Sequence, residues 1–236
     1  MSTATSEIRA VLTGDIVRSS LLNPDDRKIL FEAFPHLSAL LRKKYPRVIT
    51  TNISNFRGDG WQLVVDEPLK ALEISVFIRT YLRFSVTDKQ IDSRIAIGIG
   101  GIEFAPENNV SAGYGAAYTI SGRLLEEIPG SQRMRLGFSS SSQNLTSASA
   151  INLVELMDVI IMNWGVSQCQ AVYWALQGLT QAEIGERWKP NPITQPSVSS
   201  SIRRAGWLPF KNAITHFEQL LGCIINSDQN AEPSAY

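Results

Sequence analysis

The sequence predicts an α+β fold in its first part and an all-α fold in its second. From Ile8 to about Ser140, strand-like runs alternate with helical ones in an order that approximates β-α-β-β-α-β-α-β. This order is typical of a ferredoxin-like antiparallel sheet that helices cover on one face. From about Asn144 onward only helical patterns remain. We therefore expect domains at residues 1–142 and 143–226, and a disordered tail at 227–236.

The elements of the first part follow from local apolar patterns. Expected strands cover residues 8–17, 48–56, 61–65, 93–102 and 133–138, and expected helices cover 24–45, 68–84 and 113–128. The second and third strands form a hairpin with the tip "RGDG", because Asp-Gly is a favoured pair in such turns. The serine-rich "SSSSQNLTSASA" at 139–150 marks the boundary, although its hydroxyls could equally cap the next helix.

Composition indicates a soluble globular protein. The 236 residues are 44% apolar, and 22 basic residues balance 22 acidic ones, so total charge argues neither for nor against nucleic acid. Cys169 and Cys223 lie far apart without metal-site spacing, which favours a reducing cytoplasm. No signal peptide is visible, and the apolar run "INLVELMDVIIMNW" carries acids and is short for a bilayer, so we expect no membrane contact.

Two strand-like runs end on aspartates with neighbouring glycines. "VLTGDIV" reaches Asp15, and "FRGDGWQ" contains Asp59. The split β-α-β-β order brings both to one edge, where two carboxylates repel unless a cation such as magnesium lies between them. Gly14, Gly58 and Gly60 would let the backbone approach a phosphate closely. The alternative is that Asp-Gly simply forms the hairpin turn.

Four ordered segments resemble the landmarks of the class III nucleotide cyclase domain: "VLTGDIVRSS", "FRGDGWQLVV", "SRIAIGIGGIE" and "YGAAYTISGRLLEEIPG". The resemblance implies that Asp15 and Asp59 hold divalent ions, Mg²⁺ or Mn²⁺, on a nucleoside triphosphate. It also implies a transition-state role for Arg123 and a head-to-tail homodimer that completes each site. The implied nucleotide-binding positions are Gly14, Ile16, Asn55, Gly58, Gly60 and Ala116.

The chain departs from the cyclase pattern where the base is read. Thr119 stands where the family has a transition-state asparagine, Ala116 where it has an acidic base-selecting residue, and Asn55 where it has a lysine. The domain therefore either binds a different nucleotide or binds triphosphate without cyclising it. Arg123 and Glu127, spaced i,i+4, would also suit an ordinary surface pair.

The second part contains a helix, a turn and a helix. Thr180 and Glu183 form a capping box, and Ile184 and Trp188 lie on the apolar face that follows. "KPNPIT" breaks this helix, and "QPSVSSSIRRAGW" starts another with Pro196 in its first turn. The pattern resembles the helix-turn-helix of bacterial regulators and sigma-factor-like domains, with a turn that is longer. The combination with a cyclase-like domain is similar to the SatD-like family.

Charge along the second part favours double-stranded DNA as a partner. No acid occurs between Glu186 and Glu218, whereas several basic residues do. We expect phosphate contacts from Arg203 and Arg204, and base contacts from Gln195, Ser197, Ser199 and Ser200. A module that binds a protein partner is the alternative. The favoured interpretation is a cytoplasmic DNA-binding regulator with a degenerate cyclase-like domain; an active cyclase and a purely assembling protein are the competing ones.

Overall fold

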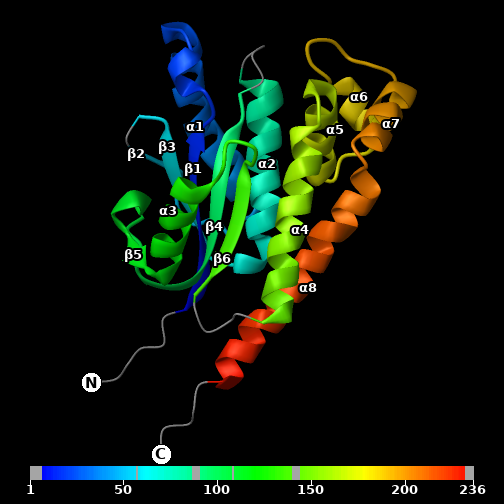
Figure 1. The fold of residues 1–236 in the computed structure, drawn as a ribbon. Coiled ribbons are helices and arrows are strands. Elements are labelled where there is room, and N and C mark those ends of the chain that lie inside the picture. Colours follow the sequence, from blue (N-terminus) through cyan, green and yellow to red (C-terminus); the bar gives the residue numbers. More distant parts are fainter. Residues whose placement is uncertain (1–6, 57, 87–90, 108, 140–143, 232–236) are drawn as a thin grey trace, which may run out of the picture.

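Six strands in residues 7–139 form one curled, mostly antiparallel sheet (Figure 1). We call these residues the sheet part. The computed structural model describes residues 7–56, 58–86, 91–107, 109–139 and 144–231. The strands are β1 (Ile8–Ile16), β2 (Ser54–Phe56), β3 (Gly60–Val65), β4 (Ser93–Phe104), β5 (Tyr114–Gly115) and β6 (Met134–Phe138). The order β2-β3-β1-β4-β5 contains the ferredoxin-like arrangement.

The sheet departs from the expected antiparallel pattern at β6, which pairs with β4 in parallel. A parallel neighbour requires a crossover connection, and α3 (Ala116–Glu127) provides it between the two strands. The predicted second strand is also shorter than expected. Only Ser54–Phe56 pairs with β3, whereas Val48, Ile49 and Ile53 are buried without forming a strand.

Helices cover both faces of the sheet, so the expectation of one covered face is wrong. The core under α1 (Pro24–Lys44) and α2 (Ala71–Ser85) takes alternate residues of each strand, while α3 packs on the opposite face. Glycine on the α3 side of β4 explains the difference. A Cβ at Gly98 would lie 2.3 Å from the carbonyl oxygen of Ala117. The missing side chain lets the helix lie directly on the strand.

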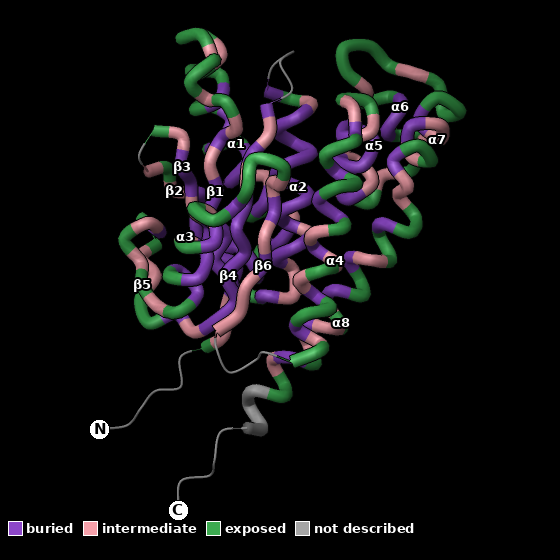
Figure 2. The backbone as a smooth tube through the Cα atoms, viewed as in Figure 1, coloured by how far each residue is buried: buried purple, intermediate pink, exposed green. Residues whose placement is uncertain are grey.

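A layer of helices covers the outer side of α2 (Figure 1). This helical part consists of α4 (Leu145–Met162), α5 (Val166–Leu176), α6 (Gln181–Glu186), α7 (Gln195–Arg204) and α8 (Trp207–Ala231). One apolar core runs from the sheet through α2 into these helices, and the ring centroids of Phe77 and Tyr173 lie 4.8 Å apart. Figure 2 shows α2 buried along most of its length.

Two predicted boundaries lie in or close to segments that the structure does not describe. The division at 142/143 lies outside the described residues, so the two domains stay a prediction. The tail predicted to be disordered from residue 227 is helical as far as Ala231, because α8 continues. Asn144 caps α4, where its side chain accepts from the Ser147 amide and the Ser147 hydroxyl accepts from the Asn144 amide.

Helix α4 is apolar enough to cross a membrane by length and composition, with a mean hydropathy of 1.5 over its 18 residues. A core helix of a soluble protein passes the same test. Its inner side carries Asp158, which is fully buried and forms an ion pair inside the fold. Leu145, Leu156 and Val159 on its outer side are exposed.

A buried arginine joins the helical part to the sheet part. Arg79 of α2 donates to both carboxylate oxygens of Asp92 at 2.9 and 2.7 Å and to Asp158 of α4 at 2.6 Å. The second oxygen of Asp158 accepts from the amides of Arg133 and Met134. All these hydrogen bonds are charge-assisted, and they provide the partners that buried ions need.

The same network lowers the pKa of Asp92. Burial opposes ionisation of Asp92, but the charge and hydrogen bonds of Arg79 and the charge of Arg83 outweigh it. A depressed folded-state pKa contributes stability that is present above the unfolded pKa and is lost as pH falls through the folded value. Acid should therefore weaken the junction between the two parts.

We expect Arg79→Met to destabilise the protein by about 3–5 kcal/mol, because it leaves the buried Asp158 without a counter-ion and Asp92 with only the more distant Arg83, at 3.8 Å. Urea unfolding at neutral pH measures the change. Arg135→Gln is the control: Arg135 forms an exposed pair with Glu127 at 3.7 Å, and its loss should change stability by less than about 1 kcal/mol. Equal effects of the two substitutions would contradict a special role for Arg79.

Candidate functional site

The structure brings Asp15 and Asp59 to the same edge of the sheet. In the β1–β3 register, Asp15 lies directly opposite Gly60, the residue after Asp59. In the β1–β4 register it lies opposite Arg94. Side chains alternate along a strand, and Asp15 follows Val11 and Thr13, which contact the α3 side. Asp15 therefore stands at the end of the sheet on the face that α3 partly covers, whereas Asp59 lies in the turn before β3, next to residues of α1.

Arg94 neutralises this edge. Its Nε donates to Asp15 Oδ1 at 2.9 Å, and its Nη2 donates to Asp15 Oδ2 in a bidentate pair. The hydrogen bond to Asp15 raises the pKa of Arg94; burial acts against it, and the charges of Asp15 and Asp59 act with it. Asp15 is thus the direct partner of Arg94, and Asp59 acts on the guanidinium only through its charge.

Asp59 is held by the turn after β1. The Ser19 hydroxyl donates to Asp59 Oδ2, and Arg27 Nη2 donates to the Ser19 carbonyl oxygen at 3.4 Å. A cavity of ≈ 330 Å³ opens beside them. Its lining consists of Ser19, Ser20, Leu22, Arg27, Leu30, Phe31, Gly58 and Asp59. The Ser19 hydroxyl, the Arg27 guanidinium and the Asp59 carboxylate thus lie around one cavity that can hold a small ligand.

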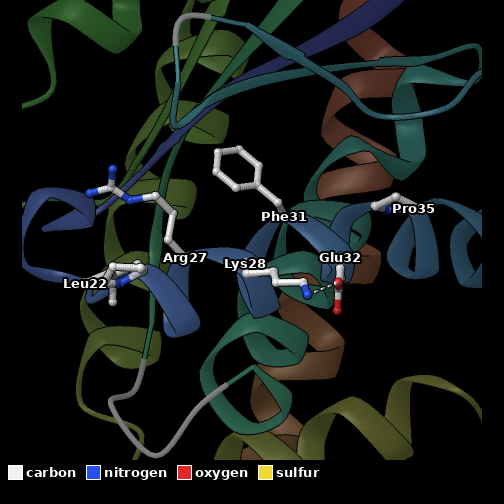
Figure 3. Close-up of a pocket in the computed structure, with 7 residues that line it drawn as sticks. Leu22, Arg27, Lys28, Phe31, Glu32 and Pro35 are labelled. Atoms are coloured by element: carbon white, nitrogen blue, oxygen red, sulfur yellow. Dashed lines mark ion pairs between the residues drawn. The ribbon is translucent and has the colours of Figure 1, made fainter.

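A larger surface hollow of ≈ 610 Å³ lies next to this cavity along α1 (Figure 3). Leu22, Arg27 and Phe31 line both spaces. Lys28 and Glu32 form an i,i+4 pair at 4.0 Å on the hollow's wall. The hollow extends the cavity away from Asp59 over an apolar surface.

Packing explains why glycine occupies some positions of the site, in addition to the predicted close approach of the backbone to a phosphate. A Cβ at Gly14 would lie 2.5 Å from the Trp61 ring, and one at Gly60 would lie 2.8 Å from the Phe56 carbonyl oxygen. Gly58 has φ +84°, a conformation that favours glycine, and has open space around it. Only Gly58 therefore faces free space beside Asp59.

The other residues that the cyclase resemblance implied as site residues differ in how far they are buried. Ile16 is buried in the core, so only its main chain is available to a ligand. Asn55 is exposed on β2 opposite Trp61. Thr119 and Ala116 lie on the exposed side of α3, where the Thr119 hydroxyl donates to the Gly115 carbonyl oxygen at 3.3 Å.

Arg123 also lies on the exposed side of α3. Its side chain is 64% exposed and lies 3.9 Å from Glu127, the surface pair that its spacing allows. Within the described part of the chain, no hydrogen bond or ion pair joins Arg123 to Asp15 or Asp59. One chain thus assembles the carboxylate half of the site without the arginine.

The candidate DNA-contacting residues share helix α7. Gln195, Ser197, Arg203 and Arg204 are exposed, and Ser199 and Ser200 are half-buried. The capping box of Thr180 and Glu183 begins α6. The connection at 187–194 turns back onto α6, where the Ile193 amide donates to the Gly185 carbonyl oxygen at 3.0 Å. Val198 and Ala205 are buried against the rest of the helical part.

The donor set for a metal ion is small. Among the residues that the structure describes, no group of three or more His, Cys, Asp or Glu side chains is placed to hold a metal. Asp15 and Asp59 are the carboxylates at the sheet edge, and both already have a protein partner. Cys169 is buried and Cys223 is exposed, and both are free thiols.

The sequence interpretation missed three residues of this site: Ser19, Ser93 and Arg94. The Ser93 hydroxyl donates to the main-chain oxygen of Asp15 at 2.7 Å and accepts from Trp61 Nε1 at 3.0 Å. A polar pair at the start of an otherwise apolar strand was the available signal. Its meaning depends on the β1–β4 register, which local patterns do not contain.

Comparison with known proteins identifies cyclases among solved structures. No family model and no curated protein matches the chain. It is similar to the guanylyl cyclase Cya2, with 20% identity and a TM-score of 0.40 over 58% of this chain and 78% of that chain. It is also similar to a bacterial light-regulated adenylyl cyclase, with 16% identity and a TM-score of 0.40 over 57% of this chain and 44% of that chain. At these values the site must be interpreted from its own residues.

We expect Gly58→Ala to destabilise the protein by about 1 kcal/mol, because a Cβ disfavours the positive φ at this position. Gly130→Ala is the matched control: Gly130 also has open space but lacks a positive φ, so this substitution should leave stability unchanged or raise it by about 0.4–1 kcal/mol. Thermal unfolding compares the two. Equal destabilisation would show that the turn does not depend on the conformation of Gly58.

Proposed function

We propose that this protein binds the triphosphate of a nucleotide, together with Mg²⁺ or Mn²⁺, at Asp15, Asp59 and Arg94. The observation that carries the proposal is the Arg94–Asp15 pair at one sheet edge with Asp59, next to a cavity lined by Ser19 and Arg27. Guanidinium groups suit phosphate oxygens, and carboxylates suit divalent cations. The edge therefore offers both kinds of group that a metal-bound triphosphate requires.

The donor set fits a metal ion that brings further oxygens with it. Magnesium keeps several waters and is commonly held by one or two carboxylates plus substrate phosphates. Asp15 and Asp59 would supply the carboxylates. Asp15 would exchange Arg94 for the ion, and the released guanidinium would then be free to meet a phosphate oxygen. A bound divalent ion would supply charge neutralisation of the triphosphate.

Cyclase activity is the less supported version of this function. Thr119 and Ala116 do not offer the groups with which the resembled cyclases stabilise the transition state and select the base. Arg123 has no bond to the two aspartates within the described chain, so it would act from a second copy in a head-to-tail dimer. The nucleotide is therefore bound for sensing in the favoured version, and a cytoplasmic location stays a prediction.

Calorimetry with each nucleoside triphosphate and Mg²⁺ tests the site. Asp59→Asn should weaken binding of the metal–triphosphate complex by about tenfold or more, because one of two protein carboxylates is lost. Arg94→Gln should weaken triphosphate binding measured without metal and strengthen binding of Mn²⁺ alone, because Asp15 is released. Asp66→Asn is the control, since Asp66 pairs with Arg9 and Thr50 elsewhere on the sheet. Equal affinity of wild type and Asp59→Asn would remove the metal from the proposal.

A separate measurement decides between sensing and catalysis. Incubation with each triphosphate and Mn²⁺, followed by mass spectrometry, detects any cyclic product. If product forms, mixing Arg123→Ala with Asp59→Asn should restore part of the activity that each variant lacks, because one intact site can form per heterodimer. Failure of restoration in a mixed dimer would contradict the two-chain site.

We further propose that α7 contacts double-stranded DNA, as in a helix-turn-helix regulator. Support comes from Arg203 and Arg204, which are exposed and have no ion pair among the described residues. Free cations on one helix suit a phosphate backbone. Gln195 donates one hydrogen bond to Gln181 at 3.2 Å, which leaves its second amide hydrogen and its carbonyl oxygen for a base contact. The likeness to SatD-like proteins stays a prediction, because no family model matches.

Replacing Arg203 and Arg204 by alanine should weaken binding to every duplex and lower the salt slope by about 2, because fewer counterions are released. Ser200→Ala should change sequence preference with little change in slope. Anisotropy titrations at two salt concentrations separate these effects. Arg42→Ala with Lys43→Ala removes the same charge from the exposed end of α1 and serves as the control. If both double variants behave alike, the basic residues of α7 are not a DNA-binding surface.

A further inference from the structure

We propose a second anion site, a pocket for a phosphate group on the opposite side of the turn that follows β1. A cavity of ≈ 410 Å³ opens between this turn, the start of β4 and the end of α4. Three arginines from separate elements line it: Arg18 of the turn, Arg83 of α2 and Arg133 before β6. We call it the arginine pocket.

The arginine pocket is separate from the site of Asp15 and Asp59. Asp15 follows the residues of β1 that face α3, whereas Arg83 and Met162 come from α2 and α4 on the other side of the sheet. The Val17 amide donates to the Asp92 carbonyl oxygen at 2.9 Å and closes the backbone between the two sides. Leu22 lies between this pocket and the cavity beside Asp59 and lines both, but neither Asp15 nor Asp59 lines the arginine pocket.

Positive charge is in excess around the arginine pocket. Arg79, Arg83, Arg133 and Arg18 bring four guanidinium groups, against the two carboxylates of Asp92 and Asp158. Arg79 takes both oxygens of Asp92, which leaves Arg83 at 3.8 Å from that carboxylate. Two positive charges therefore lack a carboxylate in the described structure, a condition that an anionic ligand would relieve.

Carbonyl oxygens hold two of the three arginines that line the pocket, Arg83 and Arg133. Arg83 donates to the carbonyl of Ile161 at 2.6 Å and to that of Trp164. Arg133 donates through Nη1 to the carbonyls of Gly130 and Gln132, both at 2.7 Å. Carbonyl oxygens fix a guanidinium without cancelling its charge, so these donors are positioned before a ligand arrives.

Arg18 adds a second, independent sign. It has φ +57° and ψ +31°, the left-handed conformation that a side chain with a Cβ disfavours. Its guanidinium is exposed and has no hydrogen bond or ion pair among the described residues. Backbone strain of this kind concentrates at ligand-binding turns. The strained residue presents a free cation at the rim of the pocket.

The chemistry points to a phosphate group as ligand. Guanidinium groups bind phosphate oxygens in a planar, bidentate manner. The rest of the lining consists of Asp92, whose carboxylate oxygens are both taken by Arg79, and five apolar residues: Val17, Leu21, Leu22, Ile91 and Met162. This wall admits either free phosphate or the organic portion of a phosphate ester. Because Ser19 next to Arg18 holds Asp59, an occupied pocket also constrains the turn on which the first site depends.

The test titrates the full chain with inorganic phosphate at constant ionic strength, without divalent ions or nucleotide, and follows the Tm and the heat of binding. Wild type should show saturable stabilisation. Arg18→Asn, which keeps a residue that tolerates positive φ, and Arg133→Gln should each weaken phosphate binding by about tenfold, the loss of one charge-assisted contact. A parallel titration with adenosine monophosphate distinguishes the sources, since tighter binding of either ligand identifies free or esterified phosphate.

Two controls separate this site from the proposed nucleotide site and from general charge. Arg135→Gln removes the same charge two residues along from Arg133, where Arg135 pairs with Glu127, and should leave phosphate binding unchanged. Asp59→Asn should keep the phosphate response even if it loses metal–triphosphate binding. The proposal is overturned if wild type shows no saturable response, or if Arg135→Gln weakens binding as much as Arg133→Gln does.

Discussion

The ion network of Arg79 is the constraint on which the rest of the structure depends. A fully buried guanidinium needs carboxylate partners. Arg79 finds them in two elements that are far apart in sequence: Asp92 directly precedes β4, and Asp158 lies within α4. The ion pairs of Arg79 therefore fix the residue directly before β4 and the inner side of α4 at once. Because Asp158 also accepts from the amides of Arg133 and Met134, the same contact positions β6. The helical part is held to the sheet by polar contacts as well as by the shared apolar core.

The placement of β4 in turn decides the chemistry of the sheet edge. Its register with β1 puts Arg94 opposite Asp15, and the hydroxyl of Ser93 ties the Asp15 main chain to the Trp61 ring. Glycines at positions such as Gly98 let α3 approach one face closely, whereas Asp15 lies near the end of the strand pairing, opposite Gly60 and Arg94. A closely packed sheet centre and an open charged edge result from the same alternation of residues along β4.

Charges are distributed differently in the two parts. In the sheet part, the arginines near the turn after β1 are paired with carboxylates, fixed by carbonyl oxygens or, at Arg18, free beside a cavity. In the helical part, Arg203 and Arg204 of α7 are exposed on the surface. Enclosed, positioned cations suit a small anion, whereas exposed cations along a helix suit an extended polyanion. The proposed phosphate site and the proposed DNA contact rest on these two arrangements.

The sequence by itself determined the local features. Apolar alternation predicted most strands, and the capping box of Thr180 and Glu183 predicted the start of α6. The segment "RGDG" predicted the position of the hairpin turn, but not its conformation: Gly58 has the positive φ, and Gly60 of the Asp-Gly pair already begins β3. Tertiary structure alone decided the parallel pairing of β6, the side of the sheet that α3 covers, the continuation of α8 to Ala231 and the partner of Asp15. The reason is physical: periodicity and caps depend on neighbours along the chain, whereas register, burial of Arg79 and the meeting of Arg94 with Asp15 depend on residues far apart in sequence.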